Sequence, residues 1–201
     1  MCDVMVLHAV LTGQLDADRD AELLERVPYA YRLELERRDS SARSASLQGL
    51  RLLADGFLRV RGTVLDVSQL RFPGGGKPSM DGGPWFSISH SASRVAVAVS
   101  DRCDVGLDLE DLAAHGVDPV ALERWTAIEA ALKAVGAGLR QSREVSLSLD
   151  LATADIAGVR VYTRPLLLTP GCVATLATRE PVERVAVEER GWGIVCSVSI
   201  S

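Results

Sequence analysis

The chain has 201 residues, of which 47% are hydrophobic, 24% charged and 4% aromatic, and its formal net charge is −5. This composition is typical of a folded globular protein with an aliphatic core rather than of a disordered chain. No apolar run reaches the ~20 residues that a membrane span requires, and the segment MCDVMVLHAV lacks the basic stretch of a signal peptide, so we expect neither a membrane protein nor a secreted one.

The first part of the chain, over residues 19–56, is predicted to be largely helical. The segment DRDAELLERV has an acidic first turn and apolar residues at helical spacing, and Pro28 interrupts this pattern. A second helix is predicted from Ser40 to Ala54, with Gly56 just past its end. Residues 71–84 include three consecutive glycines and two prolines in RFPGGGKP, so we expect a long turn there.

Strands are predicted in the middle of the chain. WFSIS and RVAVAVS have strand composition, and VGLDLE alternates apolar and polar residues. Residues 101–104 are predicted to join the last two of these strands as a hairpin.

The second half begins with strand VGLDLE, continues with a helix from Trp125 to Val135 that ends at Gly136, and holds β-rich runs after residue 158: VRVYT, CVATLAT, RVAVEE and IVCSVSI. Because the long helix of each half precedes most of its predicted strands, we predict an α+β fold rather than a repeating βαβ sheet. A boundary near residue 100 gives an N-terminal half, 1–100, and a C-terminal half, 101–201.

The four cysteines stand far apart and without CxxC spacing, at positions Cys2, Cys103, Cys172 and Cys196. This arrangement favours neither a disulfide framework nor a zinc site. We therefore expect reduced thiols in a cytoplasmic protein.

Charge is distributed unevenly along the chain. Residues 1–100 carry 12 basic and 12 acidic residues, whereas residues 101–201 carry 10 and 15. Residues 37–61 contain six arginines and two acids, which suits a phosphorylated ligand or an acidic partner, or else forms a solvated helix face. Nucleic-acid binding is not expected, since it favours a more basic domain. Of the 22 basic residues only Lys77 and Lys133 are lysines.

The segment VGLDLE places two carboxylates on one face of a strand. Residues two apart share a face, so Leu107 and Leu109 are predicted to enter the core while Asp108 and Glu110 project together on the other side. Such a pair suits Mg²⁺, which takes carboxylate ligands together with substrate phosphates. The alternative is an exposed strand face with ordinary acids.

Glu129 and Lys133 lie four residues apart in a largely apolar helix. They form either a surface contact or a site that combines a metal ligand or base with a cation for phosphate. Ser89 and His90 end a strand and are predicted to donate hydrogen bonds to an anion. GGGKP lacks the GxxxxGK[ST] pattern of a phosphate-binding loop, so Lys77 is either held on a stiff turn or exposed on a flexible loop.

Four motifs in this order, GKP (76–78), FSISHS (86–91), VGLDLE (105–110) and WTAIEAALKAVGAGL (125–139), resemble the Sfp-type 4′-phosphopantetheinyl transferases. These enzymes transfer 4′-phosphopantetheine from coenzyme A to a serine of an acyl, polyketide or peptidyl carrier protein and use Mg²⁺. The resemblance implies a monomer with two similar α+β halves related by a pseudo-twofold axis, coenzyme A between them, and no nucleic-acid or membrane partner.

The resemblance also implies residue roles. It makes Asp108, Glu110 and Glu129 the metal ligands, and Glu129 also the base for the carrier serine. Lys133 and His90 resemble the catalytic cations that grip the pyrophosphate, with Ser89 beside them. The residues implied to contact the nucleotide end of coenzyme A are Lys77, Arg38 and Arg43.

Two features depart from the family pattern. Ile128 stands where the family's W-x-x-K-E-A-x-x-K motif has its first lysine, and only 14 residues separate Glu110 from Trp125. An alternative is therefore a coenzyme A-binding relative that no longer transfers the group. A Mg²⁺-dependent phosphohydrolase is a third hypothesis, which rests on the carboxylates alone.

Overall fold

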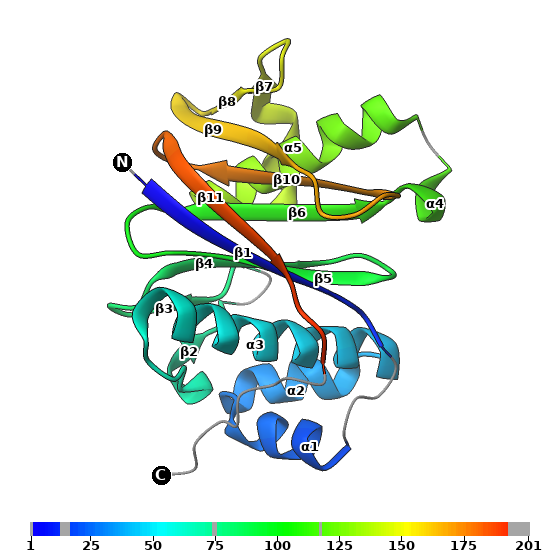
Figure 1. The fold of residues 1–201 in the computed structure, drawn as a ribbon, viewed down its shortest axis with the longest axis vertical. Coiled ribbons are helices and arrows are strands. Elements are labelled where there is room, and N and C mark those ends of the chain that lie inside the picture. The colour runs from blue at the N-terminus through cyan, green and yellow to red at the C-terminus, as the bar shows by residue number, and fades with distance from the viewer. Residues whose placement is uncertain (1, 13–16, 74–75, 117, 193–201) are drawn as a thin grey trace.

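The protein is an α+β fold built around two main sheets (Figure 1). The computed structural model describes residues 2–12, 17–73, 76–116 and 118–192. The first sheet has the strand order β11-β1-β5-β4 and the second the order β6-β10-β9-β8-β7. Figure 1 shows α3 on the outer side of the first sheet and α5 on the outer side of the second, so the strands lie between two helical layers.

The strands, in chain order, are β1 (Cys2–Val10), β2 (Leu70–Arg71), β3 (Ser79–Met80), β4 (Trp85–His90), β5 (Arg94–Ser100), β6 (Val105–Asp111), β7 (Val145–Leu147), β8 (Thr153–Ile156), β9 (Val159–Leu166), β10 (Cys172–Thr178) and β11 (Val182–Glu189). The helices are α1 (Ala17–Arg26), α2 (Tyr29–Arg37), α3 (Ser40–Arg61), α4 (Leu112–His115) and α5 (Pro119–Val135), with short 3-10 helices at Val67–Gln69 and Leu139–Glu144. The run IVCSVSI lies outside the described residues.

The N-terminal helices are longer and more numerous than predicted. The helical pattern is interrupted at Pro28 as predicted, but a second helix follows at once: α2 begins at Tyr29 with Pro28 as its N-cap residue. The expected end of α3 at Gly56 is wrong: α3 continues to Arg61, and Gly62 ends it with a left-handed φ of 68°. Gly56 instead lets α3 approach β5, since a Cβ there would lie 2.8 Å from Val99 Cγ2.

The predicted hairpin between β5 and β6 is also wrong. Both edges of β5 are occupied, by β1 on one side and β4 on the other, so β6 pairs with β10 in the second sheet. Residues 101–104 therefore carry the chain from one sheet to the other. Residues 74–75 of the long turn expected over 71–84 lie outside the described residues. On either side of them β2 pairs with β3, so the chain forms a minimal hairpin there.

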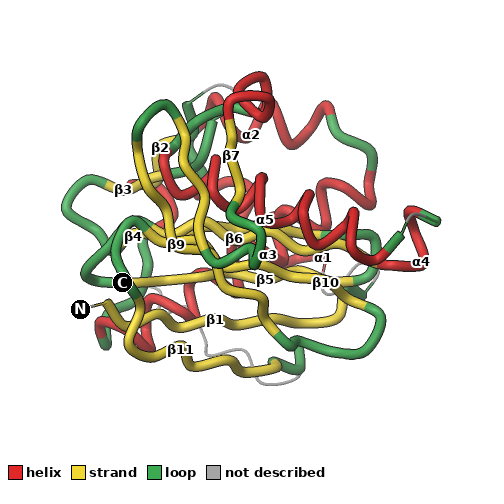
Figure 2. The backbone as a smooth tube through the Cα atoms, turned by 90° about the horizontal axis from the view of Figure 1, so that it is seen from above, coloured by secondary structure: helices red, strands yellow, loops and turns green. Residues whose placement is uncertain are grey.

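The two ends of the described chain meet in the first sheet. β11 runs parallel to β1, with Val4 beside Val185 and Val6 beside Val187 (Figure 2). A strand beyond residue 100 thus completes the sheet that carries β4 and β5.

Cys2 and Cys103 form a disulfide, so the expectation of reduced thiols is wrong for this pair. Their Cα atoms are 6.1 Å apart although 101 positions separate them in sequence. The sequence spacing could not show this, because the pairing of β1 with β5 brings the start of β1 to the 101–104 connection. Cys172 is a free thiol, and Cys196 lies outside the described residues.

Three apolar clusters connect these layers. One lies between α3 and the first sheet, one between the two sheets, and one between α5 and the second sheet. Leu107 and Leu109 belong to the middle cluster, which confirms their prediction as core residues. Within the described part of the chain, no helix combines the length and apolar character needed to cross a membrane.

Candidate metal and phosphate site

The site begins with the close packing of α5 on β6. Gly106 of β6 lies directly beneath α5, and a Cβ built on it would come 1.9 Å from the Ala130 carbonyl oxygen and 2.5 Å from the Ala134 nitrogen. Only a residue without a side chain permits this approach. Ala130 lies next to Glu129 and Ala134 next to Lys133, so this contact determines how far both polar side chains lie from β6.

Three carboxylates meet where α5 crosses β6. One oxygen each from Asp108, Glu110 and Glu129 lies within 4.8 Å of the others. Asp108 and Glu110 share a face of β6, as the alternation predicts, and Glu129 comes from α5. The structure thus brings together the three residues that the sequence analysis assigned as metal ligands.

Asp108 is the buried member of this cluster, with 2% of its surface exposed. Its Oδ1 accepts hydrogen bonds from Lys133 Nζ at 2.6 Å and from Ser89 Oγ at 2.9 Å. Its buried Oδ2 has no hydrogen-bond partner among the described residues. Burial raises the pKa of the Asp108 carboxyl above its ordinary value, and the charge of Lys133 opposes that rise.

Lys133 joins the carboxylates to β4. Besides its ion pair with Asp108, its Nζ lies 3.2 Å from Ser89 Oγ and 3.7 Å from Glu129 Oε2. Burial, and then the charge of Asp108, raises the pKa of Glu129. The Glu129–Lys133 pair is therefore part of a partly buried cluster and not an isolated surface contact.

Two serines connect β4 to β6, although the strands belong to different sheets. Ser87 Oγ accepts a hydrogen bond from the Leu107 backbone N–H at 3.0 Å, and Ser89 Oγ donates to Asp108. Ser89 was predicted from the sequence as a site residue, whereas Ser87, which is almost fully buried, was not. The alternation of FSISH, which places both serines on one face, was the available signal.

His90 ends β4 near Arg38. The residue as a whole is exposed, but the chain covers much of its ring. This burial lowers the pKa of the imidazole, and the positive charges of Arg38 and Lys133 lower it further. The Arg38 guanidinium donates to Ser46 Oγ and Glu34 Oε1, both at 2.8 Å. The structure therefore places His90 and Arg38 close enough to interact electrostatically.

Arg43 lies elsewhere. It lines a cavity of about 570 Å³ at the start of α3, together with residues of α1 and Ala92 of the β4–β5 turn. The residues that line this cavity do not include the carboxylates or Lys133, so the structure does not bring Arg43 to the metal ligands.

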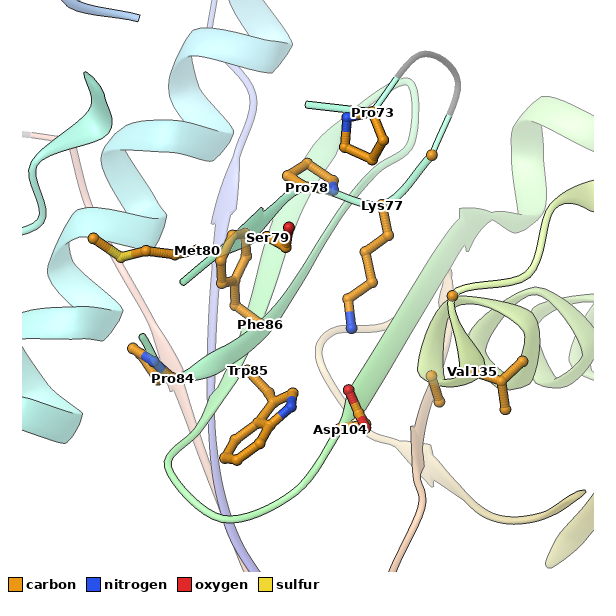
Figure 3. A pocket seen from close by; sticks show the side chains of 13 residues that line it. Pro73, Lys77, Pro78, Ser79, Met80, Pro84, Trp85, Phe86, Asp104 and Val135 are labelled. Carbon is orange, nitrogen blue, oxygen red and sulfur yellow. The ribbon is translucent and has the colours of Figure 1, made fainter. Parts of the chain in front are cut away.

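Lys77 lies on the wall between two further cavities. One, of about 390 Å³, is also lined by Glu129 and Lys133, and the other, of about 410 Å³, by Trp85 and Asp104 (Figure 3). Lys77 Nζ donates to the Val105 carbonyl oxygen at 2.6 Å. Burial lowers the pKa of Lys77 to about 8, against an opposing effect of the Asp104 charge.

The donor set fits a hard divalent cation. Three carboxylates offer only oxygen ligands, which Mg²⁺ prefers, and the unpartnered Asp108 Oδ2 is a buried acceptor suited to such an ion. Lys133 adds a fixed positive charge for phosphate. Chemically, the arrangement can neutralise a pyrophosphate and hold a hydroxyl near a carboxylate base.

Ile128, where a lysine was expected by resemblance, packs partly buried against the apolar cluster of α5, β8 and β9.

Comparison of the chain with protein-family models and with curated proteins finds no match.

Proposed function

We propose that the protein transfers 4′-phosphopantetheine from coenzyme A to a serine of an acyl, polyketide or peptidyl carrier protein in a Mg²⁺-dependent reaction. The observation that carries the proposal is the convergence of Asp108, Glu110 and Glu129 within 4.8 Å, on two elements whose sequence motifs resemble the transferases. The proposal includes a cytoplasmic monomer whose halves are related by a pseudo-twofold axis. One long helix covers the outer face of each main sheet, which supports that symmetry, and β11 of the C-terminal half completes the sheet of the N-terminal half.

The three carboxylates would hold Mg²⁺, which supplies charge neutralisation to the pyrophosphate of coenzyme A. Lys133 binds the same phosphates, because its Nζ already projects to the carboxylate cluster. His90 donates to the pyrophosphate from the end of β4, and Lys77, Arg38 and Arg43 bind the nucleotide end.

Glu129 accepts the proton of the carrier serine. The serine oxygen then bonds to the phosphorus that carries pantetheine, and the bond from that phosphorus to the nucleotide breaks. The leaving group is 3′,5′-ADP. The chain's own task is to position two reactants and to neutralise their charge, which phosphoryl-type transfer requires most.

A labelling assay tests the proposal. The protein is incubated with fluorescent coenzyme A and a panel of apo carrier proteins, with and without Mg²⁺, and modification is followed as a mass increase of one labelled phosphopantetheine. We expect Mg²⁺-dependent transfer that Asp108→Ala abolishes. The matched control is Asp155→Ala, which removes an exposed acid of β8 paired with Arg160 and should retain the activity. Absence of transfer to every carrier contradicts the proposal.

A second candidate is coenzyme A binding without transfer. The observation that favours it is the packing of Ile128 into the apolar cluster beside α5, since the motif of the transferases places a cation there. Calorimetry separates the two candidates: tight binding of coenzyme A together with no transfer to any carrier supports the second one.

A further inference from the structure

Lys77 and Lys133 line one cavity together, but their amines have different partners. The chain has two lysines among its 22 basic residues. Lys77 extends from the segment before β3 toward Asp104, as Figure 3 shows. Because it lines two cavities, its amine faces space that a small molecule can occupy even though the side chain is largely covered.

The amine lies between apolar side chains and a few charged groups. The cavity shared with Asp104 is walled by Trp85 and Phe86 of β4 and by three prolines, and the C-terminal end of α5 borders it. Glu129 and Lys133 of α5 line the second cavity together with Lys77. Asp104 is the charged side chain that acts on Lys77 from the β5–β6 connection. The Asp104 charge only partly offsets the effect of burial on the Lys77 pKa, so part of the amine is neutral near pH 7.

The hydrogen bond to Val105 fixes the direction of the amine. Lys77 Nζ donates to the Val105 carbonyl oxygen at 2.6 Å. A neutral amine can keep this bond with one N–H and still present its lone pair, whereas an ammonium has no lone pair. With a pKa of about 8, Lys77 holds at pH 7 roughly 200 times more free amine than an ordinary lysine.

Lys133 provides the internal comparison. Its Nζ is bound by Asp108 at 2.6 Å and lies 3.7 Å from a Glu129 oxygen. Attack by this nitrogen on an electrophile would require breaking an ion pair with a buried carboxylate. The two lysines should therefore react at very different rates.

We propose that Lys77 is an acylation site whose Nζ, held by Val105 at the wall of the cavity that Trp85 and Phe86 line, takes the acyl group from small acyl thioesters or acyl phosphates. The nitrogen lone pair bonds to the carbonyl carbon, and the carbon–sulfur or carbon–oxygen bond breaks. The thiolate or phosphate departs with the bonding electrons, and the nitrogen releases a proton to solvent. The product is a neutral amide. This inference does not depend on the proposed transferase activity.

The experiment uses the folded, full-length chain and two acetyl donors. Acetyl phosphate tests the chemistry alone, and acetyl-coenzyme A tests whether a thioester donor reaches the same amine. Peptide mapping by mass spectrometry assigns each acetyl group to one amine over time. We expect Lys77 to be acetylated at least about tenfold faster than Lys133, with a rate that rises with pH and levels off above the Lys77 pKa of about 8.

Two variants and one control sharpen the test. Asp104→Asn removes the charge that favours the ammonium, so it should accelerate acetylation of Lys77 near pH 7. Asp101→Asn lies on the same connection but removes a partner of Arg61, so it should leave the rate unchanged. The same reaction in urea shows whether the preference depends on the fold.

Equal acetylation of Lys77 and Lys133 in the folded protein would overturn the inference. A preference for Lys77 that survives in urea would also overturn it, since local sequence and not the cavity would then be its cause. Modification by acetyl phosphate but not by acetyl-coenzyme A supports the site and restricts its donors to acyl phosphates.

Discussion

Replacing Gly106 by alanine should separate α5 from β6 and disperse the carboxylate cluster. The added Cβ would meet the Ala130 carbonyl oxygen at 1.9 Å and the Ala134 nitrogen at 2.5 Å. Both obstacles are backbone atoms, which no rotamer change can move. Ordinary contact begins near 3.4 Å, so α5 must withdraw by about 1.5 Å at this point.

Overpacking of a well-filled interior typically costs about 1–3 kcal/mol. Because a helix backbone must move here, we expect a loss in the free energy of unfolding of about 3 kcal/mol, near the upper end of that range. Native domains have about 5–15 kcal/mol available, so the variant should still fold. A shift of this size moves Glu129 away from Asp108 by a large fraction of the ~2 Å length of a Mg²⁺–oxygen bond.

The assay is urea unfolding with and without Mg²⁺. The wild-type protein should be stabilised by Mg²⁺, and the Gly106→Ala variant should be less stable and lose this response. Gly138→Ala is the matched control for stability, because its Cβ would enter open space next to α5 at an ordinary φ. If Gly106→Ala unfolds like Gly138→Ala and keeps the Mg²⁺ response, Gly106 does not determine the geometry of the site.

The remaining predictions concern the disulfide, a buried histidine and Lys133, the cation that we propose binds phosphate. Cys2→Ser removes the disulfide and opens a loop of about 100 residues, so under oxidising conditions it should lower the free energy of unfolding by about 2–5 kcal/mol. In reductant, where the wild-type disulfide is also open, the two proteins should be equally stable. Unfolding in urea measures this, with Cys172→Ser as the control. Burial lowers the pKa of His8 below 6.5, so the native state binds fewer protons and stability should fall as pH drops through 6.5. His8→Asn should reduce that slope in unfolding measured between about pH 5 and pH 8. Lys133→Met should slow carrier labelling by about 100-fold or more, and it should also lower the melting temperature, because it leaves the buried Asp108 carboxylate without its cation. Lys133→Arg should restore little of the rate, since a planar fork does not replace a point charge; unchanged rates in both variants would remove Lys133 from the site.

Local patterns predicted the parts of the site that lie on one element. The alternation in VGLDLE placed Leu107 in the core and Asp108 beside Glu110, and the structure confirms this because a strand alternates faces wherever it pairs. Helical spacing likewise placed Glu129 and Lys133 on one face of α5, and the expected helix end at Gly136 is confirmed.

What local patterns could not predict are contacts between distant segments. The parallel pairing of β1 with β11, the separation of β5 from β6 into two sheets and the Cys2–Cys103 disulfide all depend on which strand edges find partners. Periodicity specifies which face of a strand is apolar, and not which strand lies next to it. The short β7 and β8 escaped prediction for a related reason: they are three and four residues long, too short to show a period.

The serine contacts between β4 and β6 explain why the candidate site lies where the two sheets meet. Strands that pair by a continuous ladder direct their backbone groups at each other, whereas here Ser87 Oγ accepts the Leu107 N–H and Ser89 Oγ donates to Asp108. The junction is therefore polar. Groups from β4 and from β6 face the same space. Lys133 reaches this space from α5, the helix that packs on the second sheet. A ligand bound there contacts both sheets at once, so the site depends on their relative position and not on either sheet alone.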